Sequence, residues 1–184
     1  MFTNKGIIDK ASRIILESAT PEHAQLLYDI FMGINTQKYS PVSKVSVPEL
    51  AERLNGAGRN FSEQASVYRY FGKIESNPFG TFVVKNIDWE ARNAEIGFSL
   101  LDAWQGQGFG SALVYKCVGK IFAESVIDTV WATVSVTNEA CRKLMHSLGF
   151  NDCGLYKETF VINGEPVQQI LYQMSRLQAR DLFP

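Results

Sequence analysis

Three glycines alternate with other residues in the segment Gln105–Gly110, Q-G-Q-G-F-G, directly before an amphipathic stretch. The N–H groups in the first turn of a helix have no intrahelical partner, and the helix dipole adds a partial positive charge there. Because Gly106, Gly108 and Gly110 carry no side chains, a phosphate or pyrophosphate can approach these N–H groups closely. The segment therefore predicts an anion site. The alternative is a turn whose glycines only allow a strand to pack closely on a helix.

Two common phosphate-binding motifs do not fit this segment. A P-loop requires Gly-Lys-Ser/Thr, but Lys73 and Lys120, which both follow a glycine, are followed by isoleucine. A dinucleotide fingerprint requires a third glycine where Ser111 stands and an acidic residue where the next predicted strand ends in Thr137-Asn138. A nucleotide-dependent oxidoreductase that uses the same glycines stays open as an alternative.

Composition limits the class of protein. A length of 184 residues fits one domain, since domains average about 150 residues. The 18 Lys and Arg nearly balance the 19 Asp and Glu, which excludes a generally basic, nucleic-acid-binding surface. The 3 cysteines and 2 histidines lack the spacing of metal ligands, so we expect reduced thiols and no metal ion. No long apolar run or signal-like N-terminus is present, and we expect a cytoplasmic protein without a membrane span.

The elements that must position the glycine-rich turn follow from hydrophobic periodicity. Alternating or β-branched runs predict strands at residues 13–17, 66–74, 80–84, 94–101, 130–136, 155–162 and 167–175. Apolar residues at helical spacing predict helices that begin at Thr20-Pro21 and that span residues 48–54, 108–122 and 138–148. The polar stretch 33–45 predicts an exposed loop, and Asn163-Gly164 predicts a hairpin turn. This order indicates an α/β (α+β) domain.

Two blocks of the sequence carry a family resemblance. Gln105–Gly110 matches the pattern Q/R-x-x-G-x-G/A at every fixed position, and Asn138–Phe150, N-E-A-C-R-K-L-M-H-S-L-G-F, matches a second helix that ends in Leu-Gly-Phe. With these blocks the chain resembles the GNAT superfamily of acyl-CoA-dependent N-acetyltransferases, and most of all its Rim-type branch, which acts on ribosomal proteins. The resemblance implies a single domain at 12–178, with an N-terminal extension at 1–11 and a C-terminal tail at 179–184. It also implies a mixed, mostly antiparallel sheet that is flanked by helices and splayed between its fourth and fifth strands.

The resemblance also implies acetyl-CoA as cosubstrate. Backbone N–H groups of the glycine-rich loop would wrap the pyrophosphate, and Ser111 would continue that wrap. The pantetheine arm would bond to the exposed strand edge at Leu100 and Leu101. Asn138 would reach the pantetheine amides, cap its helix, or do both. The implied cofactor-binding residues are Leu100, Leu101, Gln105, Gly106, Gln107, Gly108, Phe109, Gly110, Ser111 and Asn138.

The chemistry implied by the resemblance is direct attack of an amine on the thioester in a ternary complex. The amine arrives as an ammonium ion, so a base must remove a proton. Glu95 is the predicted base, acting through water, and a structural salt bridge is the alternative.

The general acid is left open, because Met145 stands where many members of the superfamily have a tyrosine. Tyr156, Tyr172 and Ser147 are unranked replacements, while His146 is predicted to lie on the surface. Cys141 is predicted to be a neutral small residue, with an oxidation-prone thiol as the alternative.

The predicted function is acetyl transfer from acetyl-CoA to a primary amine, either a protein N-terminus or a small amine. Acceptor-cleft candidates, for which the alternative is ordinary core packing, are Tyr28, Phe31, Tyr68, Tyr70 and Phe98. No acidic run typical of a polyamine pocket is present, and Arg69, Lys73 and Arg92 are candidates to meet a peptide or an anionic substrate. A non-catalytic acyl-CoA-binding or regulatory module is the other alternative. We expect no nucleic-acid or membrane partner, and a monomer or homodimer.

Overall fold

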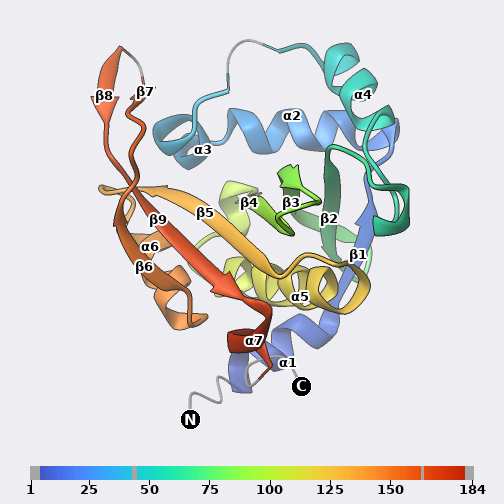
Figure 1. The fold of residues 1–184 in the computed structure, drawn as a ribbon. Coiled ribbons are helices and arrows are strands. Elements are labelled where there is room, and N and C mark those ends of the chain that lie inside the picture. Colours follow the sequence, from blue (N-terminus) through green and yellow to red (C-terminus); the bar gives the residue numbers. More distant parts are fainter. Residues whose placement is uncertain (1–4, 43–44, 163, 181–184) are drawn as a thin grey trace.

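A computed structural model describes residues 5–42, 45–162 and 164–180 (Figure 1). Its main feature is a seven-stranded sheet in the order β1-β2-β3-β4-β5-β9-β6. The strands are β1 (Ile14–Ser18), β2 (Tyr68–Ile74), β3 (Asn77–Asp88), β4 (Asn93–Leu100), β5 (Thr129–Ser135), β6 (Asn151–Leu155) and β9 (Gln169–Ser175). Neighbours pair antiparallel except β4 and β5, which are parallel. The predicted mixed, mostly antiparallel sheet is confirmed.

Helices cover both faces of this sheet (Figure 1). One face carries α2 (Ala24–Met32), α3 (Ile34–Tyr39) and α4 (Val47–Asn55), and the other carries α1 (Lys5–Arg13), α5 (Phe109–Glu124), α6 (Glu139–Ser147) and α7 (Arg176–Ala179). Short 3-10 turns are Pro21–His23, Phe61–Glu63 and Asp102–Trp104. Each face has its own apolar cluster, and the cluster that α5 covers is the larger. None of the helices described is long and apolar enough to cross a bilayer.

Local signals in the sequence fix several helix ends. Thr20 is the N-cap of the turn that leads into α2, with Pro21 at its first position as predicted. Ser46 and Glu49 form a reciprocal capping box at the start of α4, in which the Ser46 N–H donates to Glu49 Oε2 at 2.7 Å. Gly149 follows α6 with a φ of 81°, the left-handed conformation that ends many helices.

The sheet splays between β4 and β5, as predicted. Pairing between these strands covers only Asn93–Glu95 against Thr129–Trp131. The Leu101 N–H donates to the Phe79 carbonyl of β3 at 2.9 Å. Because hydrogen-bonding direction alternates along a strand, the N–H and C=O groups of Phe98 and Leu100 point the opposite way, toward β5. The edge of β4 that β5 leaves unpaired is therefore open to a ligand.

The prediction of an exposed loop at residues 33–45 is wrong for its first half, where the chain forms α3. The first N–H of this helix, on Ile34, donates to Asp102 Oδ2 at 3.0 Å, and Thr36 is buried. Asp102 lies 68 positions further along the chain, so local sequence carries no sign of this cap. Residues 43 and 44 lie outside the described residues.

Two further elements differ from expectation. Residues Lys5–Arg13 form α1, which the sequence analysis did not predict, and Arg13 ends this helix instead of beginning β1. Ile7 and Ala11 of α1 are buried, and the helix lies beside α5 (Figure 1). Burial of an apolar face on a neighbouring helix stabilises a segment too short to be helical alone.

The two predicted C-terminal strands are four. Besides β6 and β9, a separate hairpin pairs β7 (Phe160–Ile162) with β8 (Glu165–Val167). Gly154 has a φ of 83°, and the β6–β9 register shifts between Asp152 and Leu155, which marks a bulge in β6. Pairing with β9 continues to Leu155, after which the chain leaves the main sheet for the hairpin. Ile162 lies opposite Glu165, as the predicted turn requires, although Asn163 itself is outside the described residues.

Candidate active site

A cavity of about 570 Å³ lies where β4 separates from β5. This volume is in the range of ordinary small-molecule sites, roughly 300–1,000 Å³. Its walls come from α3, the end of β4, the glycine-rich loop and α6. Segments that are distant in the sequence thus meet around one space.

The glycine-rich loop forms the end of the cavity at which α5 begins. Gly106 and Gly108 have φ values of 71° and 81°, which side chains disfavour, and Gly108 is the N-cap of α5. A Cβ on Gly110 would lie 3.2 Å from Leu144 of α6, so glycine there permits close approach of the two helices. No side chain caps α5, and its first N–H groups are therefore left for a ligand. Gly106, Gly108, Gly110 and Ser111 all line the cavity, and their binding of a pyrophosphate group stays a prediction.

Gln105 holds the loop through its side chain. Its Nε2 donates to the Leu100 carbonyl at 3.1 Å and to Asp102 Oδ1 at 3.0 Å, while its Oε1 accepts from Asn35 Nδ2. This amide therefore ties the end of β4 to α3. Gln105 borders the cavity, but its side chain positions other groups around the space.

Two of the predicted loop residues point away from the cavity. The Gln107 side chain donates to the Ala103 carbonyl at 2.7 Å. The Phe109 ring packs edge-on against Trp104, with ring centroids 4.9 Å apart. Only the backbones of Gln107 and Phe109 are left to contact a ligand in the loop.

The two residues predicted to bind pantetheine, at the end of β4, differ in their access to the cavity. Leu100 lines the cavity, along with Phe98 and Ser99. Leu101 does not line it, because its N–H donates to Phe79 and its carbonyl accepts from the Trp104 N–H, both at 2.9 Å. Both main-chain groups of Leu101 are thus already bonded within the chain. The Leu100 carbonyl accepts from Gln105 Nε2, so the available edge consists of the Leu100 N–H and the main-chain groups of Phe98.

The wall from α6 includes Asn138, Cys141 and Ser147. Asn138 Oδ1 accepts from the Cys141 N–H at 3.1 Å, so this residue caps α6 and also borders the cavity. Burial raises the pKa of Cys141 to about 12. The thiol is therefore protonated near neutral pH and is a poor nucleophile, in line with its predicted neutral role.

Glu95 lies at the last paired position of β4, opposite Trp131. Its side chain is 13% exposed, Oε1 lies 3.1 Å from Lys85 Nζ, and Oε2 accepts from Asn86 Nδ2 at 2.6 Å. Glu95 does not line the cavity, and Phe98, three positions further along the strand, is roughly 10 Å away. The contact with Lys85 is the structural ion pair that the sequence offered as the alternative to a role as base. A carboxylate has about four acceptor positions, however, so Glu95 keeps capacity for water.

The candidate acids are spread over different places. Met145, in the position of the usual tyrosine, is fully buried in the core. Ser147 lines the cavity, and its hydroxyl donates to the Leu144 carbonyl at 2.8 Å. Tyr172 is buried, and its hydroxyl lies 3.3 Å from Nε2 of His146, which is half exposed, as predicted for a surface histidine.

The residues predicted to line an acceptor cleft also lie in different parts of the structure. Tyr68 and Tyr70 are buried in the core beneath α5, which leaves Phe98 at the cavity. Phe31 packs beside the smaller core cluster and lies 5.8 Å from the Arg69 guanidinium. Burial lowers the pKa of Arg69 to about 10, which still leaves the side chain charged at neutral pH.

Part of the cavity wall comes from residues that the sequence did not predict for the site. Asn35, Thr36, Tyr39 and Ser40 form one wall of the cavity, but they lie in the segment expected to be a loop. Trp131 stacks on Tyr156 with ring centroids 6.2 Å apart, and Tyr156 stacks in turn on Phe160. This aromatic stack begins at the residue opposite Glu95, and no periodic signal links its members. Among the described residues, no cluster of three or more His, Cys, Asp or Glu could hold a metal ion.

Comparisons with known proteins agree with this geometry. A sequence model described as "Acetyltransferase (GNAT) domain" matches residues 13–151. The chain is 21% identical to the uncharacterized N-acetyltransferase YoaA of Bacillus subtilis over 167 residues, which cover 90% of this chain and 94% of that protein.

Two solved structures share the fold. Spermidine N-acetyltransferase from Vibrio cholerae, in complex with CoA and spermine, superposes with a TM-score of 0.81 at 20% identity, covering 91% of this chain and 98% of that one. RimL, a ribosomal L7/L12 alpha-N-protein acetyltransferase in complex with coenzyme A, superposes with a TM-score of 0.78 at 19% identity, covering 91% and 97%. Since the family match extends over most of the chain and agrees with both sequence blocks and the splayed sheet, the chain belongs to the GNAT family of N-acetyltransferases.

Proposed function

We propose that the protein transfers an acetyl group from acetyl-CoA to a primary amine by direct attack in a ternary complex. The observation that carries this proposal is the single cavity that connects the glycine-rich start of α5, the open edge of β4 and the wall of α3. A long cosubstrate with a charged end and a reactive end fits such a space, with α3 next to the second substrate.

The phosphate end of acetyl-CoA would bind at Gly106–Ser111. There, N–H groups and the positive end of the α5 dipole offset its charge without a dedicated arginine cluster. The pantetheine arm would extend along the main chain of Phe98 and Leu100, as an added strand does at a sheet edge. Asn138 retains a free Nδ2 at this wall, because its hydrogen bond to Cys141 uses only Oδ1.

At the reacting end, the amine nitrogen forms a bond to the thioester carbon, and the carbon–sulfur bond breaks. The amine loses its proton through water, for which Glu95 is the proposed acceptor, and the departing sulfur takes up a proton. Ser147 is the one of the three candidate acids that borders the cavity. The high pKa of Cys141 argues against an acetyl-cysteine intermediate and supports direct transfer.

For the acceptor, we favour a protein N-terminus or a small monoamine. Among the described residues, those that line the cavity include Lys143 and no Asp or Glu. A polyamine carries several positive charges and would need carboxylates at this wall. The two similar solved structures named above act on a polyamine and on a ribosomal protein, so their fold alone does not choose between these acceptors.

An acceptor screen tests the proposal. Purified protein is mixed with acetyl-CoA and a panel of N-terminal peptides, monoamines and spermidine, and release of free thiol is recorded. We expect release with at least one monoamine or peptide, and weaker release with spermidine. Preferential use of spermidine would contradict the acceptor class.

Calorimetry with acetyl-CoA and with NAD(P) accompanies the screen. Binding of NAD(P) without binding of acetyl-CoA would overturn the proposal. Tight acetyl-CoA binding without thiol release from any amine would favour the non-catalytic module. Two features of this chain are consistent with such a module: Met145 stands in place of a tyrosine acid and is buried, and Glu95 is held in an ion pair.

A further inference from the structure

Lys10 places a positive charge at the glycine-rich loop from an element outside the two sequence motifs. Its Nζ lies 3.1 Å from the position that a Cβ would occupy on Gly108, and 5.8 Å from the centroid of the Phe109 ring. Gly108 is the N-cap of α5. The ammonium group therefore stands beside the N–H groups that we assign to the phosphate end of acetyl-CoA.

The position of Lys10 is fixed by the packing of α1. Ile7 and Ala11 are buried on the side of α1 that meets α5, and Lys10 lies on the adjoining side, three residues after Ile7. Lys116 of α5 donates to the Ala11 carbonyl at 3.1 Å, which ties the two helices together. These contacts set the rotation of α1, and Lys10 is directed at the loop as a result.

Within the described part of the chain, no carboxylate forms an ion pair with Lys10. Among residues 5–42, 45–162 and 164–180, Lys10 forms no ion pair and no hydrogen bond, and its one close interaction is with the Phe109 ring. The N-terminal end of a helix is itself positive and is stabilised by anions, whereas a cation there is unfavourable. A lysine held at this end without a partner thus raises the local positive potential, and a bound phosphate would relieve it.

We propose that Lys10 binds a phosphate group of acetyl-CoA, which makes α1 part of the cosubstrate site. This inference rests on the proposed use of acetyl-CoA. The phosphate is either the pyrophosphate or the 3′-phosphate of the adenosine moiety, since both offer the same anionic oxygens to an ammonium group. Glycine at 108 leaves room for this contact, because a Cβ there would lie 3.1 Å from Lys10 Nζ and would require the ammonium group to shift.

Calorimetric titration of three ligands tests the assignment. The ligands are CoA, dephospho-CoA, which lacks the 3′-phosphate, and pantetheine, which lacks every phosphate. We expect Lys10→Ala to raise the Kd for CoA about fivefold to tenfold, as loss of one charge-assisted contact does. Lys10→Arg should bind CoA within about twofold of the wild type, because the charge is kept.

A matched control is Lys5→Ala, which removes the same charge from an exposed position of α1. We expect it to change the Kd less than twofold, and circular dichroism and the Tm establish that every variant is folded. If the loss in Lys10→Ala persists with dephospho-CoA, the contact is to the pyrophosphate, and if it disappears, the contact is to the 3′-phosphate. Pantetheine binding should be the same in all variants.

Equal effects of Lys10→Ala and Lys5→Ala on CoA would overturn the assignment, as would an equal loss of pantetheine affinity. Failure of the proposed function looks different, because wild-type protein would then bind neither CoA nor acetyl-CoA. That result would overturn both, whereas normal CoA binding in Lys10→Ala would overturn only the role of Lys10.

Discussion

At the scale of single residues, the site depends on how each polar group is already bonded. Gln105 and Leu101 have their hydrogen-bonding groups used within the chain, and the Leu100 carbonyl accepts from Gln105. The Leu100 N–H and the main-chain groups of Phe98 are directed toward the gap. The Glu95 carboxylate is only partly engaged, because it contacts Lys85 and Asn86 and keeps further acceptor positions on its oxygens. Such differences decide which residues can act on a substrate.

Replacing Glu95 by glutamine tests its proposed role as base. If the carboxylate accepts the proton of the amine through water, kcat/KM should fall about a hundredfold, and its dependence on pH should change in shape. The measurement is a pH profile of acetyl transfer with the best acceptor from the screen. Lys85→Gln is the control, because it breaks the ion pair and leaves the carboxylate in place.

Glu95→Gln with an unchanged pH profile and a lowered Tm would contradict the base and leave the ion pair as its function. A similar fall in activity in Lys85→Gln would also speak against the base, since the pair itself would then be what matters.

At the scale of elements, hydrogen bonds that involve Asp102 and Gln105 connect the helix α3 to the glycine-rich loop. Asp102 accepts from the first N–H of α3 through Oδ2 and from Gln105 through Oδ1, each at 3.0 Å, and Gln105 accepts from Asn35. The glycine-rich loop and the α3 wall of the cavity are thus joined by hydrogen bonds.

Asp102→Ala should loosen α3. Loss of the helix cap costs about 1 kcal/mol, and Gln105 loses a partner that orients it. We expect the acceptor KM to rise at least threefold and the amide N–H groups of α3 to exchange faster with deuterium. Asn35→Ala, which removes one bond and keeps the cap, should have a smaller effect on exchange. Unchanged exchange in α3 of Asp102→Ala would show that the cap does not hold this helix.

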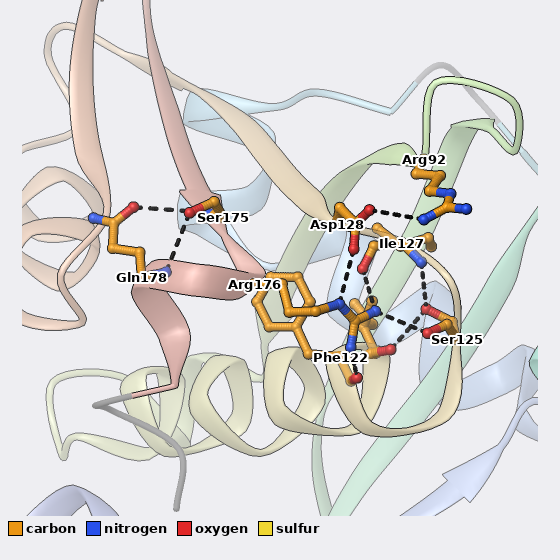
Figure 2. Close-up of polar contacts among 9 residues, drawn as sticks. Arg92, Phe122, Ser125, Ile127, Asp128, Ser175, Arg176 and Gln178 are labelled. Carbon is orange, nitrogen blue, oxygen red and sulfur yellow. Dashed lines mark hydrogen bonds and ion pairs between the residues drawn. The ribbon is translucent and has the colours of Figure 1, made fainter.

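A second link between elements joins the C-terminal segment to the end of α5. Figure 2 shows the Arg176 guanidinium directed at the carbonyls of Phe122, Ser125 and Ile127, with Nη2 at 2.8 Å from the Ser125 oxygen and 2.5 Å from the Ile127 oxygen. Its Nε donates to Asp128 at 2.9 Å. A cation at the C-terminal end of a helix is favoured by the dipole and satisfies carbonyls that have no helical partner.

Arg176→Ala should destabilise the protein by about 3 kcal/mol, because several charged hydrogen bonds to carbonyls are lost. For a chain of this length, that corresponds to a fall in Tm of roughly 6–12 °C. Arg176→Lys should recover only part of the loss, since an ammonium group cannot reach the carbonyls as a fork does. Thermal unfolding measures both variants. Arg92→Ala, at the exposed outer partner of Asp128, should change the Tm little, and an equal effect of the two would contradict this account.

At the scale of the whole molecule, the ion pairs make stability depend on pH. The Arg176 and Arg92 side chains donate to Asp128 and hold its pKa below the ordinary value of 3.8. Lys73 likewise holds the pKa of Glu17, on the edge strand β1, below its ordinary value. A carboxyl group whose pKa is lower in the folded state adds stability above its ordinary pKa and loses that contribution as the pH falls through the folded value.

We therefore expect Asp128→Asn to unfold at a lower temperature than the wild type at pH 7. The difference should shrink as the pH falls below about 4, because the wild-type carboxylate is then protonated too. Calorimetric scans from pH 7 to pH 2.5 measure this. A difference in Tm that stays constant over the whole range would show that the charge of Asp128 is not what stabilises the fold.

The sequence alone was sufficient for what local chemistry decides. Thr20-Pro21 and Gly149 marked helix ends, and the alternating glycines marked the turn that leads into α5. These features depend on backbone conformation and on spacing within a few residues, so they can be recognised without neighbours in space. The splayed sheet was implied by the family resemblance of the two motif blocks, and the anion site at the glycines stays a prediction.

Tertiary structure decided what depends on contacts between distant segments. α3 forms because Asp102, 68 residues away, caps it, and α1 forms because it buries Ile7 and Ala11 on α5. The contacts of Glu95 and the direction of Lys10 follow from the same packing. No pattern along the chain encodes these contacts, because their free energy appears only when the partners come together in the folded domain.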